Sequence, residues 1–133
     1  MKYMIMTFGD ASAWDTLGLG GTEATWSQEE VAAHFSAMSG FYADLAASGE
    51  MVTGFGLADP SHTMTVEIRD GRPVASDGPL AEAKEVLAGF GIIDVASHDR
   101  AVELAARFAA IVRSRVELRP IMEPGADDPG RKM

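Results

Sequence analysis

The sequence predicts a single α+β domain of the ferredoxin-like type, in which two helices cover one face of a mainly antiparallel sheet. Strand and helix patterns follow one another in the order strand, helix, strand, hairpin, strand, helix, strand. This order gives two βαβ-like halves and places both helices on the same side of the sheet. The length of 133 residues suits one ordinary domain. We assign this domain to residues 1–123 and expect residues 124–133, which have no apolar periodicity, to form a flexible tail.

The first half is predicted to contain a strand, a long loop and a helix. Both alternating faces of Lys2–Phe8 are apolar, as in a central strand, whereas residues 9–26 have four glycines, two tryptophans and no periodicity, as in a loop. Ser27 and Glu30 have the spacing of a capping box that begins a helix, and Gly49 is placed to end it. Apolar residues at spacings of three and four predict its buried stripe: Val31, Phe35, Met38, Tyr42 and Leu45.

The middle of the chain is predicted to form a hairpin. A short strand over Met51–Leu57 comes first, and His62–Arg69 then alternates between apolar and polar residues. Asp70-Gly71 favours a tight turn, and Arg72–Ser76 is the return strand. The alternation predicts that the apolar residues of the hairpin point inward, namely Met64, Val66 and Ile68.

The last third predicts a strand, a helix and a strand. Gly89 and Gly91 interrupt the strand Leu87–Val95, where they either allow another backbone to approach closely or make room for a ligand. Ser97 caps a helix that runs through Val112, and Val116–Met122 closes the sheet. Because two helices cover only one face, the other face is expected to expose apolar side chains and to pair in a homodimer; we place there Tyr3, Ile5 and Phe90 or their neighbours.

Composition excludes several classes of function. A net charge of −9 and a pI near 4.6 oppose direct binding to nucleic acids and to anionic membranes. No cysteine is present, so disulfides and thiolate metal sites are excluded. The three histidines lie far apart without a metal-ligand spacing, so we predict neither a metal nor another cofactor. The N-terminal apolar run is too short for a signal peptide or membrane span, which predicts a cytoplasmic protein.

The least generic segment begins with Asp77-Gly78-Pro79, a tight corner. Gly78 tolerates a positive φ and Pro79 fixes its own φ. Charged residues follow at Glu82 and Lys84, so that Asp77, if desolvated, would act as a general base with a raised pKa. The alternative is structural: Asp77 accepts hydrogen bonds from the amides of the turn, and the charges that follow form a solvated face.

His62 is the second candidate for proton transfer, because an imidazole titrates near neutral pH. With Asp77 it suggests a cofactor-independent lyase or isomerase, in which Lys84 or Arg69 stabilises the developing anion. A third hypothesis is a protein-interaction module whose acidic surface meets a basic partner.

The chain resembles the YCII-related family, and within it the DGPF-type proteins. The resemblance runs from Met1-Lys2-Tyr3-Met4 to the segment 117–123, through Gly54-Phe55-Gly56-Leu57, the Asp77-Gly78-Pro79 corner and Gly91-Ile92-Ile93-Asp94-Val95. Leu80 stands where the name-giving Phe is usual. The resemblance implies a dimeric α+β barrel and an association with extracytoplasmic-function sigma factors.

Relatives in this family include enzymes that use a His and Asp pair from the first helix. Here, alignment on Gly49 places Met38 at the position of that histidine, and His34 lies one turn earlier. Our leading hypothesis is therefore a homodimer that binds a small ligand in a cleft between sheet and helices. Beside the catalytic candidates Asp77 and His62, its expected contact residues are Gly78, Pro79, Glu82, Lys84 and Tyr3.

Overall fold

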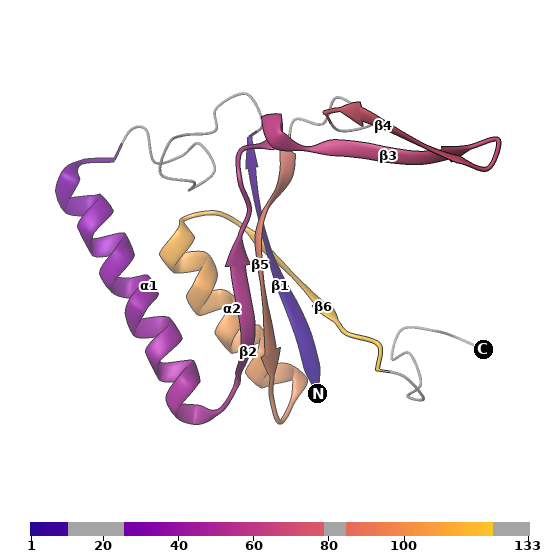
Figure 1. Ribbon diagram of the computed structural model, residues 1–133. Coiled ribbons are helices and arrows are strands. Elements are labelled where there is room, and N and C mark those ends of the chain that lie inside the picture. The colour runs from indigo at the N-terminus through magenta and orange to yellow at the C-terminus, as the bar shows by residue number, and fades with distance from the viewer. Residues whose placement is uncertain (11–25, 79–84, 124–133) are drawn as a thin grey trace.

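The computed structural model describes residues 1–10, 26–78 and 85–123. Its main sheet has four antiparallel strands in the order β2-β5-β1-β6, and helices α1 and α2 lie on one face of it (Figure 1). The α+β class and the placement of both helices on one face are confirmed, and the strand order is that of a ferredoxin-like domain. The elements are β1 (Lys2–Asp10), α1 (Gln28–Ser48), β2 (Met51–Gly56), β5 (Glu85–Asp94), α2 (His98–Val112) and β6 (Val116–Pro120).

The ends of both helices follow the local sequence. The Ser27 hydroxyl accepts a hydrogen bond from the Glu30 amide at 3.1 Å, and the Glu30 carboxylate accepts one from the Ser27 amide at 3.3 Å, so the predicted capping box is confirmed. Gly49 ends α1 with a φ of 77°. Ser97 caps α2 by accepting from the Arg100 amide. Neither helix of the described ranges combines the length and apolarity needed to cross a membrane.

Strand boundaries differ from the prediction by a few residues. β1 continues through Gly9 to Asp10, β5 begins at Glu85, and β6 ends at Pro120. The remainder of the predicted loop, residues 11–25, and the predicted tail, residues 124–133, lie outside the described residues.

The buried stripe of α1 is rotated from the predicted one. His34, Phe41 and Leu45 are buried, whereas Phe35 and Tyr42 are 47% and 37% exposed. Both stripes fit the repeat of an α-helix, so periodicity alone does not separate them. Packing against α2 determines which face of α1 is buried, because the ring centroid of Phe108 on α2 lies 5.3 Å from that of Phe41.

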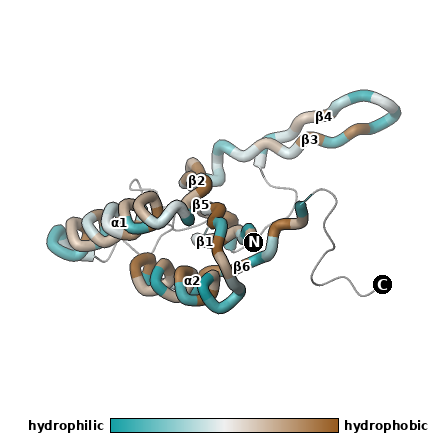
Figure 2. The backbone as a smooth tube through the Cα atoms, turned by 90° about the horizontal axis from the view of Figure 1, so that it is seen from below, coloured by the Kyte–Doolittle hydropathy of each residue, from teal (hydrophilic) through white to brown (hydrophobic). Residues whose placement is uncertain are grey.

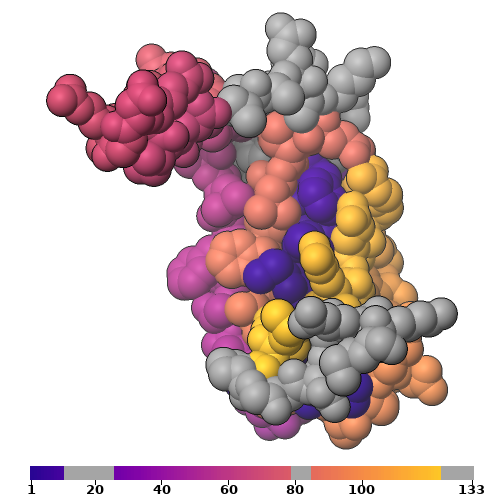
Figure 3. Space-filling view, turned by 90° about the vertical axis from the view of Figure 1, so that its right-hand side faces the viewer, coloured from indigo at the N-terminus to yellow at the C-terminus, as the bar shows by residue number. Residues whose placement is uncertain are grey.

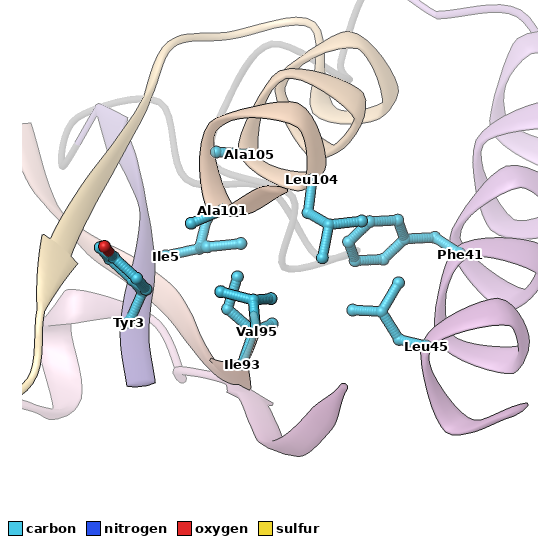
Figure 4. Close-up of a cluster of buried hydrophobic side chains, with 9 residues drawn as sticks. All are labelled: Tyr3, Ile5, Phe41, Leu45, Ile93, Val95, Ala101, Leu104 and Ala105. Atoms are coloured by element: carbon cyan, nitrogen blue, oxygen red, sulfur yellow. The ribbon is translucent and has the colours of Figure 1, made fainter. Parts of the chain in front are cut away.

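The hydrophobic core lies between the sheet and the two helices (Figure 4). Leu104 and Ala101 of α2 and Phe41 and Leu45 of α1 pack there against strand side chains. The expectation that Tyr3 and Ile5 lie on the uncovered face is wrong, because both face the helices. The complete core consists of Tyr3, Ile5, Phe41, Leu45, Ile93, Val95, Ala101, Leu104 and Ala105.

The face of the sheet opposite the helices is apolar at its centre. Residues directly opposite each other on antiparallel strands point to the same face. Met6 pairs with Phe90 and Phe90 with Phe55, while Met4 pairs with Ile92. We call this surface, which Figure 3 views directly, the open sheet face; its apolar residues are Met4, Met6, Phe55, Phe90 and Ile92. The predicted apolar face therefore exists, made of Phe90 and the neighbours of Tyr3 and Ile5.

The predicted hairpin forms a separate two-stranded sheet, β3 (Met64–Arg69) and β4 (Arg72–Asp77), which projects from the body (Figures 1 and 2). We call it the arm. The prediction that its apolar residues point inward is wrong: Met64, Val66 and Ile68 are 59%, 63% and 70% exposed. The alternation is present, but no element of the described chain covers that face.

Gly89 is explained by the close approach of a neighbouring strand. A Cβ atom on Gly89 would lie 3.0 Å from the Phe55 carbonyl oxygen, which is too close for an ordinary contact. A Cβ atom on Gly91 would lie 3.7 Å from the Thr53 oxygen, an ordinary distance. Of the two alternatives drawn from the sequence, backbone approach accounts for Gly89.

A bidentate ion pair joins the end of α1 to the start of α2. The Arg100 guanidinium donates to both carboxylate oxygens of Glu50 at 2.9 and 2.8 Å, and the Ser48 hydroxyl donates at 2.8 Å. The hydrogen bonds from Arg100, then the one from Ser48, lower the pKa of Glu50 from 4.5 to about 2.

This shift predicts a loss of stability in acid. Because the pKa of Glu50 is depressed in the folded state, its contribution to the free energy of unfolding is present above pH 4.5 and is lost as the pH falls toward 2. We expect Glu50→Gln to lower the free energy of unfolding at pH 7 and to flatten its fall between pH 4.5 and 2, measured by urea denaturation. Glu103→Gln, which removes the more exposed partner of Arg100, is the control and should keep the wild-type slope. An unchanged slope in Glu50→Gln would contradict the assignment.

Candidate functional site

The Asp77-Gly78 corner lies at the base of the arm. Gly78 has a φ of 86°, as its role in a tight turn requires. The Gly78 amide donates to the Thr63 carbonyl at 2.8 Å, and the Thr65 hydroxyl donates to the Gly78 carbonyl at 2.6 Å. Both backbone groups of Gly78 thus hold the two strands of the arm together, while Asp77 is exposed at the end of β4.

His62 lies at the same base. It is the last residue of a short 3-10 turn, Pro60–His62, and it is exposed. The next residue, Thr63, accepts the hydrogen bond from Gly78, so the backbone brings His62 and Asp77 to the same end of the arm. The structure therefore places the two residues that the sequence proposed for proton transfer at the same end of the arm, where both are exposed to solvent.

The other predicted contact residues are not gathered at this corner. Pro79, Glu82 and Lys84 lie outside the described residues. Tyr3 is 2% exposed in the core, near the start of β1, whereas the strand that leaves the corner pairs with the far end of β1 at Asp10. The Tyr3 hydroxyl lies 3.4 Å from Nδ1 of His98.

Glu85 follows the undescribed part of the corner and is an ionised carboxylate. Arg115 donates to both of its oxygens at 2.6 Å. These hydrogen bonds lower the pKa of Glu85 from its ordinary value. This carboxylate therefore lacks the raised pKa that a general base needs.

A groove lies between α1 and α2, with a volume of about 450 Å³. Small side chains of both helices form its apolar wall, and charged groups stand around it. We call it the helix groove; its lining consists of Glu30, Ala33, His34, Ala37, Gly40, Arg107, Ala110, Ile111 and Arg113. The sequence reasoning missed it, although Ala33, Ala37 and Gly40 recur at helical spacing.

His34 is the buried polar residue of this groove. Its side chain is 5% exposed, and Nδ1 lies 3.2 Å from the Ile111 carbonyl oxygen. A carbonyl oxygen only accepts, so Nδ1 donates this hydrogen bond, and in the tautomer with a single proton on Nδ1 the other nitrogen, Nε2, is an acceptor. Ile111 is in the last turn of α2, where carbonyls lack partners within the helix, so His34 also ties α1 to the end of α2.

Two ion pairs bridge the helices beside the groove. Arg113 donates to Glu30 at 2.6 Å, and Arg107 donates to Asp44 at 2.6 Å. The hydrogen bond from Arg113 lowers the pKa of Glu30, which therefore stays ionised. Each guanidinium has five N–H donors, so one bond to a carboxylate leaves others available for a ligand.

Between the sheet and the helices, where the sequence predicts a ligand cleft, the described residues line a much smaller space. A cavity of about 20 Å³ lies there, where the missing side chain of Gly91 leaves space beside Ile5, Phe41 and Tyr42. This volume corresponds to about one water molecule.

Within the described ranges, no three His, Asp or Glu side chains gather closely enough to hold a metal ion.

Comparison with known proteins identifies the family. The model of the YCII-related domain matches residues 1–124. An uncharacterized protein of Rhizobium meliloti (strain 1021) is 31% identical over 108 residues, which cover 79% of this chain and 77% of that protein. The match spans nearly the whole chain, as the resemblance in the sequence implied. The chain therefore belongs to the YCII-related family.

Proposed function

We propose that the protein is a homodimer that binds a small organic ligand in the helix groove. The proposed ligand site is supported by one observation: the groove has a volume of about 450 Å³, and the buried imidazole of His34 is part of its lining. Ligand pockets have volumes of about 300–1,000 Å³ and combine an apolar wall with a few placed polar groups. The helix groove has both features.

The lining suggests the chemistry of the ligand. Ala33, Ala37 and Ala110 leave room for a narrow apolar body. Arg107 and Arg113 offer N–H donors to an acidic group, and Nε2 of His34 offers an acceptor to a hydroxyl or amine. Each guanidinium is already paired with a carboxylate, so we propose a ligand that carries one acidic group on an apolar body.

The site is testable with benzoate, a small acid with an apolar ring. We expect saturation-transfer NMR to show benzoate binding to the wild type, and Ala37→Trp, which fills the groove, to weaken it at least about 10-fold, or about 1.4 kcal/mol. Ala43→Trp, an exposed change on the same helix outside the groove, is the matched control. Equal binding by wild type and Ala37→Trp would contradict the site.

A second candidate is the corner at the base of the arm. The hydrogen bond between Gly78 and Thr63 supports it, because it holds the segments of Asp77 and His62 at one end of the arm, where a lyase or isomerase would use both side chains for proton transfer. The same benzoate-binding experiment distinguishes the two candidate sites. Asp77→Asn leaves benzoate binding intact if the helix groove is the site, and abolishes it if the corner is the site.

The dimer part of the proposal is supported by the open sheet face. Phe55 is 64% exposed there, beside Phe90 and Met6. A contiguous apolar surface on a folded chain indicates an interface. Two copies that meet through this face would form the dimeric α+β barrel that the family resemblance implies.

A further inference from the structure

The arm is amphipathic, and its apolar face is exposed. The register of β3 and β4 pairs Val66 with Ala75 and Ile68 with Pro73, so these four side chains lie on one face, with Met64. Thr65, Glu67 and Arg69 alternate onto the other face, where Arg69 pairs with Glu67 at 2.9 Å. An isolated two-stranded hairpin is marginally stable in water. The alternation therefore indicates that the apolar face packs against something.

The arm is built for contact through its face. Pro73 has no N–H to offer to an added strand, and charged residues at Arg69, Asp70 and Arg72 surround the tip. Prolines and charges at an edge oppose strand addition. Strand addition at the β4 edge is therefore disfavoured, and the exposed apolar face is a surface available for binding.

The direction of the arm identifies the occupant. Figures 1 and 2 show the arm extending away from the helices, on the side of the open sheet face. In Figure 3, which views that face, the arm stands beside it. A second copy of the chain placed on the open sheet face would therefore lie alongside the arm.

The size of the sheet supports the same occupant. Four strands about 4.8 Å apart and about six residues long have a planar footprint of roughly 400 Å². A stable dimer interface takes about 800 Å² from each partner. The exposed apolar face of the arm adds to the area that a second copy would cover.

We propose that the arm crosses to a second copy of the chain and packs its apolar face against that copy's body. This inference rests on the proposed homodimer. Each subunit then holds the other with its own arm, so the arm's apolar residues are buried in the dimer, as the sequence alternation requires. The turn at Asp77-Gly78 sets the base from which the arm leaves the body.

Photocrosslinking tests the proposal on the full chain. p-Benzoylphenylalanine is placed at Ile68 on the apolar face or, as the matched control, at Val74 on the opposite face of the same hairpin. Both positions are exposed, so neither change threatens the fold. After irradiation of the dimer we expect a covalent dimer on a denaturing gel from position 68, at least about 5-fold more than from position 74.

Sedimentation of the same samples tests the homodimer separately from the contact of the arm with the second copy. In one outcome the protein sediments as a dimer and yet gives no covalent dimer from position 68, or equal amounts from both positions. Either result contradicts the proposed contact of the arm and leaves the homodimer proposal standing. Sedimentation as a monomer at micromolar concentration contradicts both the homodimer proposal and the proposed contact of the arm. A covalent dimer specific to position 68 supports both.

Discussion

Phe41→Ala is expected to lower the free energy of unfolding by about 3–5 kcal/mol, the range for removing a fully buried phenylalanine. The Phe41 side chain is 2% exposed and packs between the two helices, with the Phe108 ring on one side and the Arg107 guanidinium 5.2 Å from its ring centroid. Its removal leaves a cavity that the rigid sheet below cannot fill. Urea denaturation followed by circular dichroism measures the effect.

Phe35→Ala is the matched control, since it makes the same chemical change on the same helix. Phe35 is 47% exposed, so we expect a loss on the order of 1 kcal/mol. The pair also tests the orientation of α1. A larger loss from Phe35→Ala than from Phe41→Ala would show that the stripe predicted from the sequence, and not the one in the structure, faces the core.

Phe55→Asp is expected to convert the proposed homodimer to a monomer. The substitution moves two carboxylates, one from each subunit, into an apolar interface, where an unpaired charge is costly. We expect the dissociation constant to rise at least about 100-fold, or about 2.7 kcal/mol. Sedimentation velocity at micromolar concentration should show the wild type at twice the 14.1 kDa mass of the chain and the variant at that mass.

Val102→Asp is the control for this change. Val102 is an exposed apolar residue on α2, 46% accessible, on the opposite side of the sheet. It should remain a dimer. Dissociation of both variants, or of neither, would contradict the assignment of the interface to the open sheet face. Phe55 lies on an edge strand and is 64% exposed, so the monomer should stay folded.

Local features of the chain were predictable because they depend on near neighbours. The capping box at Ser27 and Glu30, the left-handed cap at Gly49 and the positive φ of Gly78 each involve a few consecutive residues, and all are as predicted. The candidate site was predictable to the extent that Asp77 and His62 flank the same hairpin. The helix groove was not, because it depends on which faces α1 and α2 turn toward each other.

The sequence by itself determined the order of the elements, their approximate boundaries and the α+β class, since caps, turns and periodicity are local. Only the tertiary structure decided that His34 and Phe41, not Phe35 and Tyr42, face inward, and that Tyr3 lies under the helices. It also decided that the alternating hairpin leaves the sheet and exposes Ile68. The physical reason is the same in each case: periodicity says that a face must be buried, but the element that covers it is distant in the chain.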